Sequence, residues 1–459
     1  MPDGSGKPRV MNIGLIGFGT VGTAVYQILQ QNREELRLQT RVDLRVKRIV
    51  VRDLTKPRPV AVAEGLLTDN PQDVLADPEI DIVVEMVGGA HLKPVLLQAL
   101  ASGKAVITAN KELIADHGPE LFRTAEACDV DLLFEGSVGG GIPILRPLRE
   151  TLAAGRIRRI MGIVNGTTNY ILTQMSREGK SFAAALAEAQ LAGYAEADPT
   201  ADVDGHDAAR KLAILATIAF HSRVTTADVY AEGIRRITPA DIAYGQQRGW
   251  ALKLLAIAAQ EGEQYEARVH PAFIPATHPL ASVNDAFNAI YVHGEEVGET
   301  MFYGRGAGGM PTASAVIGDI VEAAKNRRRG VSFSEVQQYN DWSRKEQVRV
   351  LSRYYLRVAL TQPAAEPAAR TLALVGAGAA GEGSQFADGQ TSARQAVEHL
   401  LPTYGIPVAY LSEYRRPDGT GDLVVETGLT TEGALHTMRE VLHGVPGVAA
   451  ITNIIRILN

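Results

Sequence analysis

A glycine-rich string between a predicted strand and a predicted helix constrains the fold of this chain more than any other feature. The apolar run Val10 to Ile16 is typical of a buried strand, and the apolar residues of Val21 to Gln31 recur at helical spacing. The string between them, GFGTVG, matches G-x-G-x-x-G, in which Gly17 permits a tight turn, Gly19 lets a pyrophosphate approach and Gly22 lets the helix pack on the strand. The sequence therefore predicts a dinucleotide site, with a plain glycine-rich connector as the alternative. Its predicted cofactor-binding residues are Gly17, Phe18, Gly19, Thr20, Val21 and Gly22.

Strands and helices continue to alternate after this turn. Apolar runs at Arg45 to Val51, Ile80 to Met86 and Ala105 to Thr108 are typical of strands, and Lys93 to Ser102 has helical spacing. Such alternation favours a parallel sheet with helices on both faces. We therefore expect a Rossmann-type dinucleotide-binding domain of the α/β class.

The end of the second predicted strand bears on the choice of cofactor. An acidic residue here binds the adenosine ribose of NAD, whereas an arginine pairs with the 2′-phosphate of NADP. The chain carries Arg52 followed by Asp53. This pair favours NADP, with NAD as an alternative, although Arg52 is equally well explained as a solvated charge at a strand end.

The length of 459 residues suggests about three domains at roughly 150 residues each. Mixed helical and strand patterns follow the first domain, and short elements in the order βαββαβ begin near residue 351. We expect an α+β catalytic and dimerisation domain and a C-terminal ferredoxin-like domain. The predicted boundaries are 1–136 plus about 306–330 for the dinucleotide-binding domain, 137–305 for the catalytic domain, 331–350 for a linker and 351–459 for the last domain.

Composition excludes several classes of partner. There are 46 Lys and Arg against 52 Asp and Glu, a net charge of −6, so the chain lacks the basic field that nucleic acids and anionic membranes attract. No apolar run approaches the length of a membrane span, and Met1 to Asn12 has no signal-peptide core. The single cysteine, Cys128, forms no internal disulfide. We expect a cytoplasmic protein with a small-molecule substrate and neither a nucleic acid nor a membrane as partner.

An acidic segment with one lysine offers the strongest indication of chemistry. Asp207 and Lys211 are four residues apart and share a face of a predicted helix. A surface ion pair worth a few tenths of a kcal/mol is the ordinary explanation. However, the residues around Lys211 are apolar, which predicts a buried lysine held by a carboxylate and placed to transfer a proton.

Two further strings suggest ligand contacts. TANKELIA ends the fourth predicted strand, where Asn110 and Lys111 would face the ligand crevice or form a solvated turn. FEGSVGGGI, residues 134–142, offers a carboxylate and glycine carbonyls that suit a hard cation or a tight turn. The ten histidines show no transition-metal spacing.

Several strings together resemble the homoserine dehydrogenase family. The resemblance covers residues 10 to 330. It rests on GFGTVG, TANK, EGSVGGGIPI, NGTTNYIL from Asn165 to Leu172, and ADPTADVDGHDAARKL from Ala197 to Leu212.

This resemblance implies that the chain reduces L-aspartate 4-semialdehyde to L-homoserine with NAD(P)H, reversibly, in the aspartate pathway to threonine and methionine. Lys211 would donate a proton to the aldehyde oxygen, Asp207 would orient it, and Lys111 would lie between cofactor and substrate. A homodimer or homotetramer is expected.

The resemblance also implies residues that bind each ligand. Those for the substrate are Glu196, at its amino group, and Asp202. Further cofactor contacts are Arg52, Lys104 and Gly306. A sodium ion would be held by Glu135, Val138, Gly140 and Ile142, the last three through backbone carbonyls.

The last hundred residues resemble an ACT domain, an amino-acid-sensing βαββαβ module. Where ACT domains carry a D-x-P-G turn after the first strand, this chain has TQPAAEPAARTLAL. Threonine binding at that turn therefore stays open. Two alternative functions are another NADP-dependent dehydrogenase of a small semialdehyde and a non-catalytic amino-acid-binding regulator, and Lys211, Asp207 and Glu196 argue against the second.

Overall fold

The computed structural model describes residues 9–332, 339–361, 392–417 and 420–458. The chain forms two compact units. The first comprises 1–235, 253–270 and 277–344, and the second comprises 236–252, 271–276 and 345–459. Each unit is described separately.

The first unit contains a six-stranded sheet in which every pairing is parallel. Its strand order is β3-β2-β1-β4-β5-β6, the order of a doubly wound dinucleotide-binding sheet. The strands are β1 (Arg9–Ile16), β2 (Val42–Val50), β3 (Leu67–Thr68), β4 (Ile80–Glu85), β5 (Ala105–Thr108) and β6 (Leu132–Leu133). The predicted Rossmann-type domain is confirmed.

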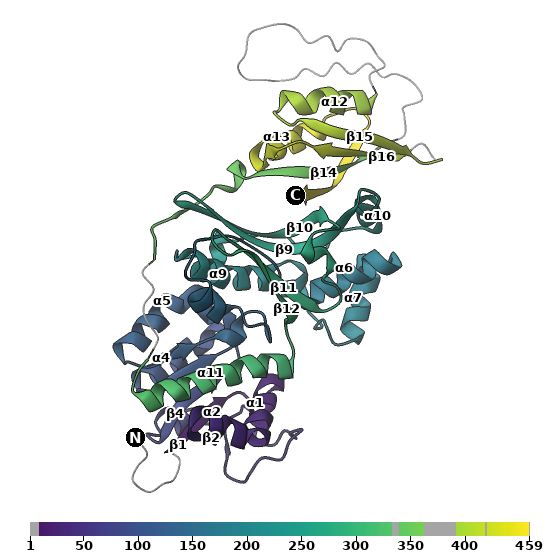
Figure 1. The fold of residues 1–459 in the computed structure, drawn as a ribbon. Coiled ribbons are helices and arrows are strands. Elements are labelled where there is room, and N and C mark those ends of the chain that lie inside the picture. The colour runs from purple at the N-terminus through teal and green to yellow at the C-terminus, as the bar shows by residue number, and fades with distance from the viewer. Residues whose placement is uncertain (1–8, 333–338, 362–391, 418–419, 459) are drawn as a thin grey trace. The chain divides into compact units, whose positions relative to one another are not determined.

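Six helices accompany this sheet, one of which comes from far along the chain. Helix α11 lies beside α1 in Figure 1, and its apolar residues belong to the same core cluster as those of β1 and α1. The helical pattern of Thr312 to Lys325 predicts a helix, which is present and is longer at both ends. The helices are α1 (Thr20–Gln31), α2 (Arg33–Thr40), α3 (Gln72–Leu75), α4 (Lys93–Ala101), α5 (Lys111–Ala127) and α11 (Gly309–Arg329).

A second sheet in the first unit orders its strands β12-β11-β7-β9-β10. The pairs β12–β11, β11–β7 and β7–β9 are antiparallel. The strands are β7 (Ile157–Ile163), β9 (Trp250–Glu261), β10 (Gln264–Pro275), β11 (Phe287–Gly294) and β12 (Gly298–Arg305), and short β8 (Tyr230–Ala231) and β13 (Ser343–Arg344) pair with β10. The ends of β9 and β10 belong to the second unit.

The helices that follow β7 carry the chemically suggestive sequence. They are α6 (Gly166–Glu178), α7 (Phe182–Leu191), α8 (Thr200–Val203) and α9 (His206–Phe220). The helix-like pattern of Pro143 to Leu152 predicts a helix over those residues, and this prediction is wrong in extent. The chain makes a single π-helical turn, Pro147–Thr151, which begins at the proline.

The second unit contains the predicted βαββαβ order. Its four-stranded antiparallel sheet has the order β18-β14-β16-β15, and the apolar faces of two helices contribute to its core. The elements are β14 (Leu351–Leu360), α12 (Ala393–Thr403), β15 (Val408–Arg415), β16 (Gly421–Thr427), α13 (Glu432–Leu442) and β18 (Val448–Ile457), with β17 (Thr430–Thr431) at the side of β14.

Helix α10 (Pro239–Gln247) belongs to this second unit, which differs from the predicted domain boundary. The Tyr244 hydroxyl donates to Oε1 of the buried Glu426 at 2.7 Å, and Arg248 donates to Oε2 at 3.0 Å. The Tyr355 hydroxyl donates to Asp241 at 3.0 Å. Buried polar groups need such partners. Sequence proximity had placed 236–252 with the catalytic domain, but these contacts join it to the tail.

No helix within the described ranges has both the length and the apolar character that crossing a bilayer requires.

Candidate active site

Two lysines share the carboxylate of Asp207. The Nζ of Lys211 lies 2.6 Å from Oδ2, and the Nζ of Lys111 lies 2.9 Å from Oδ1. Asp207 and Lys211 are one turn apart on α9, and both are 8% exposed, whereas Lys111 is the first residue of α5. The structure thus brings together all three residues predicted to be catalytic.

The amide of Asn165 is a part of this cluster that the sequence analysis missed. Its Nδ2 donates to Oδ2 of Asp207 at 2.9 Å and to Oδ1 of Asp202 at 2.7 Å. Its Oδ1 accepts from the Thr168 backbone N–H at 2.9 Å and so caps α6. An asparagine before a helix is a recognisable N-cap, and that signal could have drawn attention to Asn165.

The charge state of the cluster follows from burial and from the two ammonium groups. Burial alone raises the pKa of Asp207, but the charges of Lys211 and Lys111 and the hydrogen bonds outweigh it and bring this pKa below its usual range. For Asp202 the outcome is opposite, because burial raises its pKa more than Asn165 lowers it. Asp207 therefore stays ionised and holds both lysines.

A cavity of about 280 Å³ lies against these lysines. It extends from Lys111 and Lys211 to Val21 in the first turn of α1. The rest of its wall is contributed by Met86, Val87, Gly88, Ala109, Gly136, Ser137, Gly139, Gly140, Gly306, Ala307 and Thr312. It lies along the carboxyl ends of the parallel strands, where open α/β sheets bind their ligands.

The glycine string fits a dinucleotide. Gly17 has a φ of +98°, and a Cβ on Gly22 would lie 2.3 Å from the Gly17 carbonyl oxygen. A Cβ on Gly19, by contrast, would meet nothing within 4 Å, so space is open in front of the α1 N-terminus where phosphates bind. The Phe18 ring is buried against Tyr26, with centroids 5.7 Å apart, so only its backbone is available to the cofactor.

Two other glycine-rich segments, 136–141 and 304–309, meet at the cavity. Gly140 has a φ of +56°, and a Cβ there would come within 2.5 Å of the Gly306 carbonyl oxygen. The Gly141 N–H donates to the Arg305 carbonyl at 3.1 Å. Glycine at these positions thus lets the loop between β12 and α11 reach the cavity.

The predicted cation ligands lie beside this loop. Val138 and Ile142 are buried. The Glu135 carboxylate accepts hydrogen bonds from three backbone N–H groups, those of Ile144, Leu145 and Arg146, at 2.7–2.9 Å. A side-chain contact from Glu135 to a cation would therefore have to displace them. Within the described residues, no group of three or more His, Cys, Asp or Glu side chains could hold a metal ion.

The structure does not bring Lys104, Glu196 or Arg52 into the Asp207 cluster. Lys104 precedes β5 and donates to the carbonyls of Asp77 and Ile80, at the opposite edge of the sheet from the cavity. Its predicted cofactor contact is therefore corrected: it is a buried structural lysine. Glu196 is exposed, and Arg52 is exposed two residues after β2.

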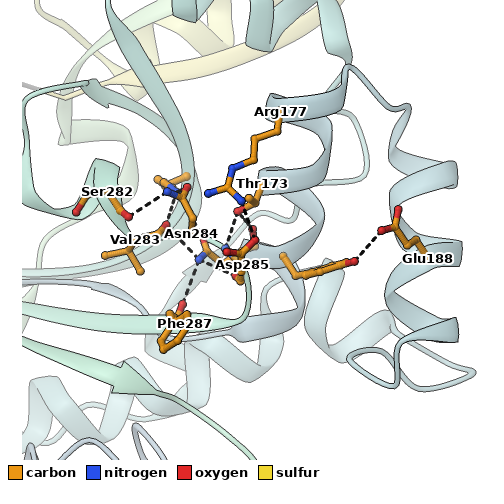
Figure 2. A network of polar contacts seen from close by, with 11 residues as sticks. Thr173, Arg177, Glu188, Ser282, Val283, Asn284, Asp285 and Phe287 are labelled. Atoms are coloured by element: carbon orange, nitrogen blue, oxygen red, sulfur yellow. Dashed lines mark hydrogen bonds and ion pairs between the residues drawn. The ribbon is translucent and has the colours of Figure 1, made fainter.

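Helix α6, which begins at the Asn165 cap, is fixed by a network of polar contacts (Figure 2). The Asp285 backbone N–H donates to Thr173 Oγ1 at 3.0 Å, and its carboxylate pairs with Arg177 at 3.1 Å. Asp285 has a φ of +56°, which these contacts help to maintain. Lys253 donates to the Val283 carbonyl, and burial lowers the pKa of Lys253 to about 8. The network holds α6, and with it Asn165, against the second sheet.

A doubly wound sheet, a glycine turn at a helix N-terminus and a buried lysine–carboxylate cluster facing one cavity define a nicotinamide-dinucleotide-dependent oxidoreductase. Residues 17–135 match the family model for the NAD-binding domain of homoserine dehydrogenase, and residues 143–321 match the homoserine dehydrogenase model. The chain belongs to the homoserine dehydrogenase family.

Individual relatives agree with this assignment. The chain is 53% identical to homoserine dehydrogenase of Corynebacterium glutamicum over 71% of this chain and 75% of that protein. A crystal structure of a homoserine dehydrogenase from Thiobacillus denitrificans aligns with a TM-score of 0.87 and 37% identity, over 98% of this chain and 99% of the other. A hyperthermophilic archaeal homoserine dehydrogenase in complex with NADPH aligns with a TM-score of 0.59 and 29% identity, over 68% and 97%.

Proposed function

We propose that this chain reduces L-aspartate 4-semialdehyde to L-homoserine, reversibly, with Lys211 as the proton donor. The observation that carries the proposal is the position of the Lys211 ammonium, 2.6 Å from Asp207 and lining the cavity that extends to the glycine turn. Family membership supports the same reaction.

The Lys211 ammonium group can donate a hydrogen bond into the cavity. An ammonium group has three N–H donors. One is directed at Asp207 and a second at the Val164 carbonyl, 2.8 Å away. The third is left for an oxygen atom in the cavity, which is the place for the aldehyde oxygen.

The nicotinamide cofactor would supply the hydride, held by the α1 N-terminus and the turn around Gly19. As negative charge develops on the aldehyde oxygen, Lys211 would transfer its proton there, and Asp207 would stabilise the ammonium until that moment. Lys111, on the other oxygen of Asp207, would lie between cofactor and substrate. Glu196 would bind the substrate's amino group, and Asp202 would also contact the substrate.

NADP is the proposed cofactor, with NAD as the alternative. Arg52 follows β2, is exposed and has no ion pair within the described residues, so its guanidinium is available to a 2′-phosphate. The NADPH complex of the archaeal relative supports the same preference.

A sodium ion is proposed at the loop that contains Glu135, Val138, Gly140 and Ile142. Because backbone N–H groups occupy the Glu135 carboxylate, backbone carbonyls of this loop would supply the contacts.

The second unit is proposed to be an ACT-like domain, on the basis of its βαββαβ order. The segment that replaces the D-x-P-G turn lies, from Gln362 onward, outside the described residues. Threonine therefore remains a proposed effector, tested by adding it to the assay. A homodimer or homotetramer is proposed as well, and the exposed Met301 and Tyr303 on edge strand β12 support self-association.

The test of the proposed function is the oxidation of NADPH by the purified full chain with L-aspartate 4-semialdehyde. Succinic semialdehyde, which lacks the amino group, is the matched control substrate. Rapid turnover with the first and little with the second is expected. Equal rates would favour a general semialdehyde dehydrogenase, and no turnover with either would contradict the proposal.

A further inference from the structure

A second cavity, of about 640 Å³, lies in the first unit and shares no wall residue with the cavity at Lys211. Cavities that bind small molecules have volumes of roughly 300–1,000 Å³. We propose that this cavity binds a small organic anion with an apolar body, and that the bound anion changes the rate of catalysis.

The inner wall of the cavity is apolar. Side chains of α5, α9 and α11, of β6 and of the residue after β6 contribute to it. They are Phe122, Leu133, Phe134, Ile214, Ile218 and Val321. The Phe122 and Phe134 rings stand edge to face with centroids 5.5 Å apart, a surface suited to an apolar or aromatic ligand.

The remaining wall carries an excess of positive charge. Its two carboxylates, Glu150 and Glu322, both pair with Arg146. Four more cations in the wall form no salt bridge within the described residues. They are Arg149, Arg223, Lys325 and Arg329.

Arg149 is the cation placed best for a ligand. Its guanidinium lies 5.5 Å from the centre of the Phe134 ring, and its Nε is buried without a hydrogen-bond partner. Buried donors are rarely left without an acceptor, so an anionic group beside Arg149 would satisfy this one.

The same three helices line both cavities. Helix α9 presents Lys211 to the first cavity and Ile214 and Ile218, three and seven residues later, to the second. Helix α5 does the same with Lys111 and Phe122.

Helix α11 repeats this arrangement with Thr312 in the first cavity and Val321 in the second. A ligand in the second cavity would therefore contact the helices that hold Lys111 and Lys211. Any shift of these helices would reach both lysines, which is how occupancy would alter the rate.

The test uses a fluorescent anion, 8-anilinonaphthalene-1-sulfonate, titrated into the full chain with saturating NADP⁺ to fill the first site. N-phenyl-1-naphthylamine, which has the same apolar body without the sulfonate, is the matched neutral probe. Saturable binding of the anion at least about tenfold tighter than that of the neutral probe is expected, because hydrogen bonds to charged groups are the strong ones. Equal affinities would overturn the assignment of an anion site.

Two substitutions of Gly318 test whether the probe binds in this cavity. Gly318 lines the cavity, and a Cβ on it would meet nothing within 4 Å, so Gly318→Phe fills the cavity without a clash at its base. Gly318→Ala is the control, because it also replaces the helical glycine but does not fill the cavity. We expect Gly318→Phe to abolish saturable binding and Gly318→Ala to retain it. If both retain it, the probe binds elsewhere and the proposal is wrong.

Arg149→Gln provides an independent result if Gly318→Phe does not fold. It should weaken the anionic probe about tenfold and leave the neutral probe unchanged. An unchanged affinity for the anion would mean that Arg149 does not bind it, contrary to the proposal.

The effect on catalysis is measured separately. The anionic probe should change kcat of the unmodified chain and leave kcat of Gly318→Phe unchanged. A bound probe without any effect on kcat would overturn the coupling between the cavities. Because the fluorescence titration needs no turnover, failure of the proposed function and failure of this anion site are distinguishable.

Discussion

Lys211 donates to Asp207 one turn earlier in the same helix, with Nζ and Oδ2 2.6 Å apart, and both side chains are buried. An exposed pair at this spacing stabilises a helix by only about 0.2–0.5 kcal/mol. A buried pair behaves differently, since removal of one partner leaves an uncompensated charge and costs roughly 3–5 kcal/mol. The third partner, Lys111, makes this carboxylate the anchor of two cations.

Lys211→Met removes the proton donor and keeps an apolar side chain of similar length. We expect kcat to fall by about two to four decades, as loss of a general acid does. The dissociation constant for NADPH, measured by fluorescence, should change little. Lys180→Met is the control, because Lys180 pairs with the half-buried Glu188 and lies outside the cluster. A near-normal kcat in Lys211→Met would contradict the proton-donor assignment.

Asp207→Asn should make the thermal stability of the chain depend less on pH in the acidic range. The pKa of Asp207 is lowered in the folded chain, because its interactions with Lys211 and Lys111 outweigh burial. The unmodified chain therefore gains stability from this carboxylate above the ordinary aspartate pKa of about 3.9, and loses it as the pH falls below that value toward the folded-state pKa.

The measurement is thermal unfolding at several pH values. The unmodified chain should exceed Asp207→Asn in Tm near neutral pH, and the difference should shrink below about pH 4. Asp341→Asn, at an exposed aspartate, should show no such trend. A constant difference for Asp207→Asn across the whole range would mean that the charge of Asp207 does not stabilise the fold.

Two alanine substitutions in the glycine turn should separate binding from folding. Gly19→Ala adds a Cβ into open space, whereas Gly22→Ala places one 2.3 Å from the Gly17 carbonyl oxygen. We expect Gly19→Ala to keep its Tm but bind NADPH at least about tenfold more weakly, since the methyl group occupies the approach of the pyrophosphate. Gly22→Ala should lower the Tm. Normal NADPH affinity in Gly19→Ala would mean that the cofactor does not bind at this turn.

Arg52→Ala tests cofactor choice. Loss of a charged contact to the 2′-phosphate should raise KM for NADPH about tenfold and leave KM for NADH unchanged. Arg9→Ala removes the same charge from the start of β1, at the opposite edge of the sheet, and should change neither value. If Arg52→Ala affects neither cofactor, Arg52 is a solvated strand-end charge.

Much of the fold could be predicted because periodic apolar patterns determine it. Ala105–Thr108 forms the predicted strand without a change in bounds. The helical pattern of Phe182–Leu191 likewise predicts a helix with the bounds that α7 has. Helix α2 was not predicted, since REELRLQT buries only Leu36 and Thr40 and offers little periodic signal. Contacts between distant segments, such as Tyr244 with Glu426, leave no local trace in the sequence.

In the candidate site, too, local spacing could be predicted from the sequence, whereas contacts between distant segments could not. Spacing along one helix predicted that Asp207 and Lys211 are partners, but the addition of Lys111 requires the tertiary arrangement of α5 and α9. The position of Lys104 could have been found from sequence. It precedes a strand, and residues before parallel strands lie at the edge opposite the ligand crevice.

Helix α11 also has a consequence for synthesis of the protein. Its Val316 and Ile320 complete the core around Met11 and Ile13 of the first strand. The nucleotide-binding half, although encoded first, cannot close its core until Arg329 at the end of α11 has left the ribosome. Its apolar sheet face therefore remains uncovered during most of translation, when emerging chains are most prone to aggregate.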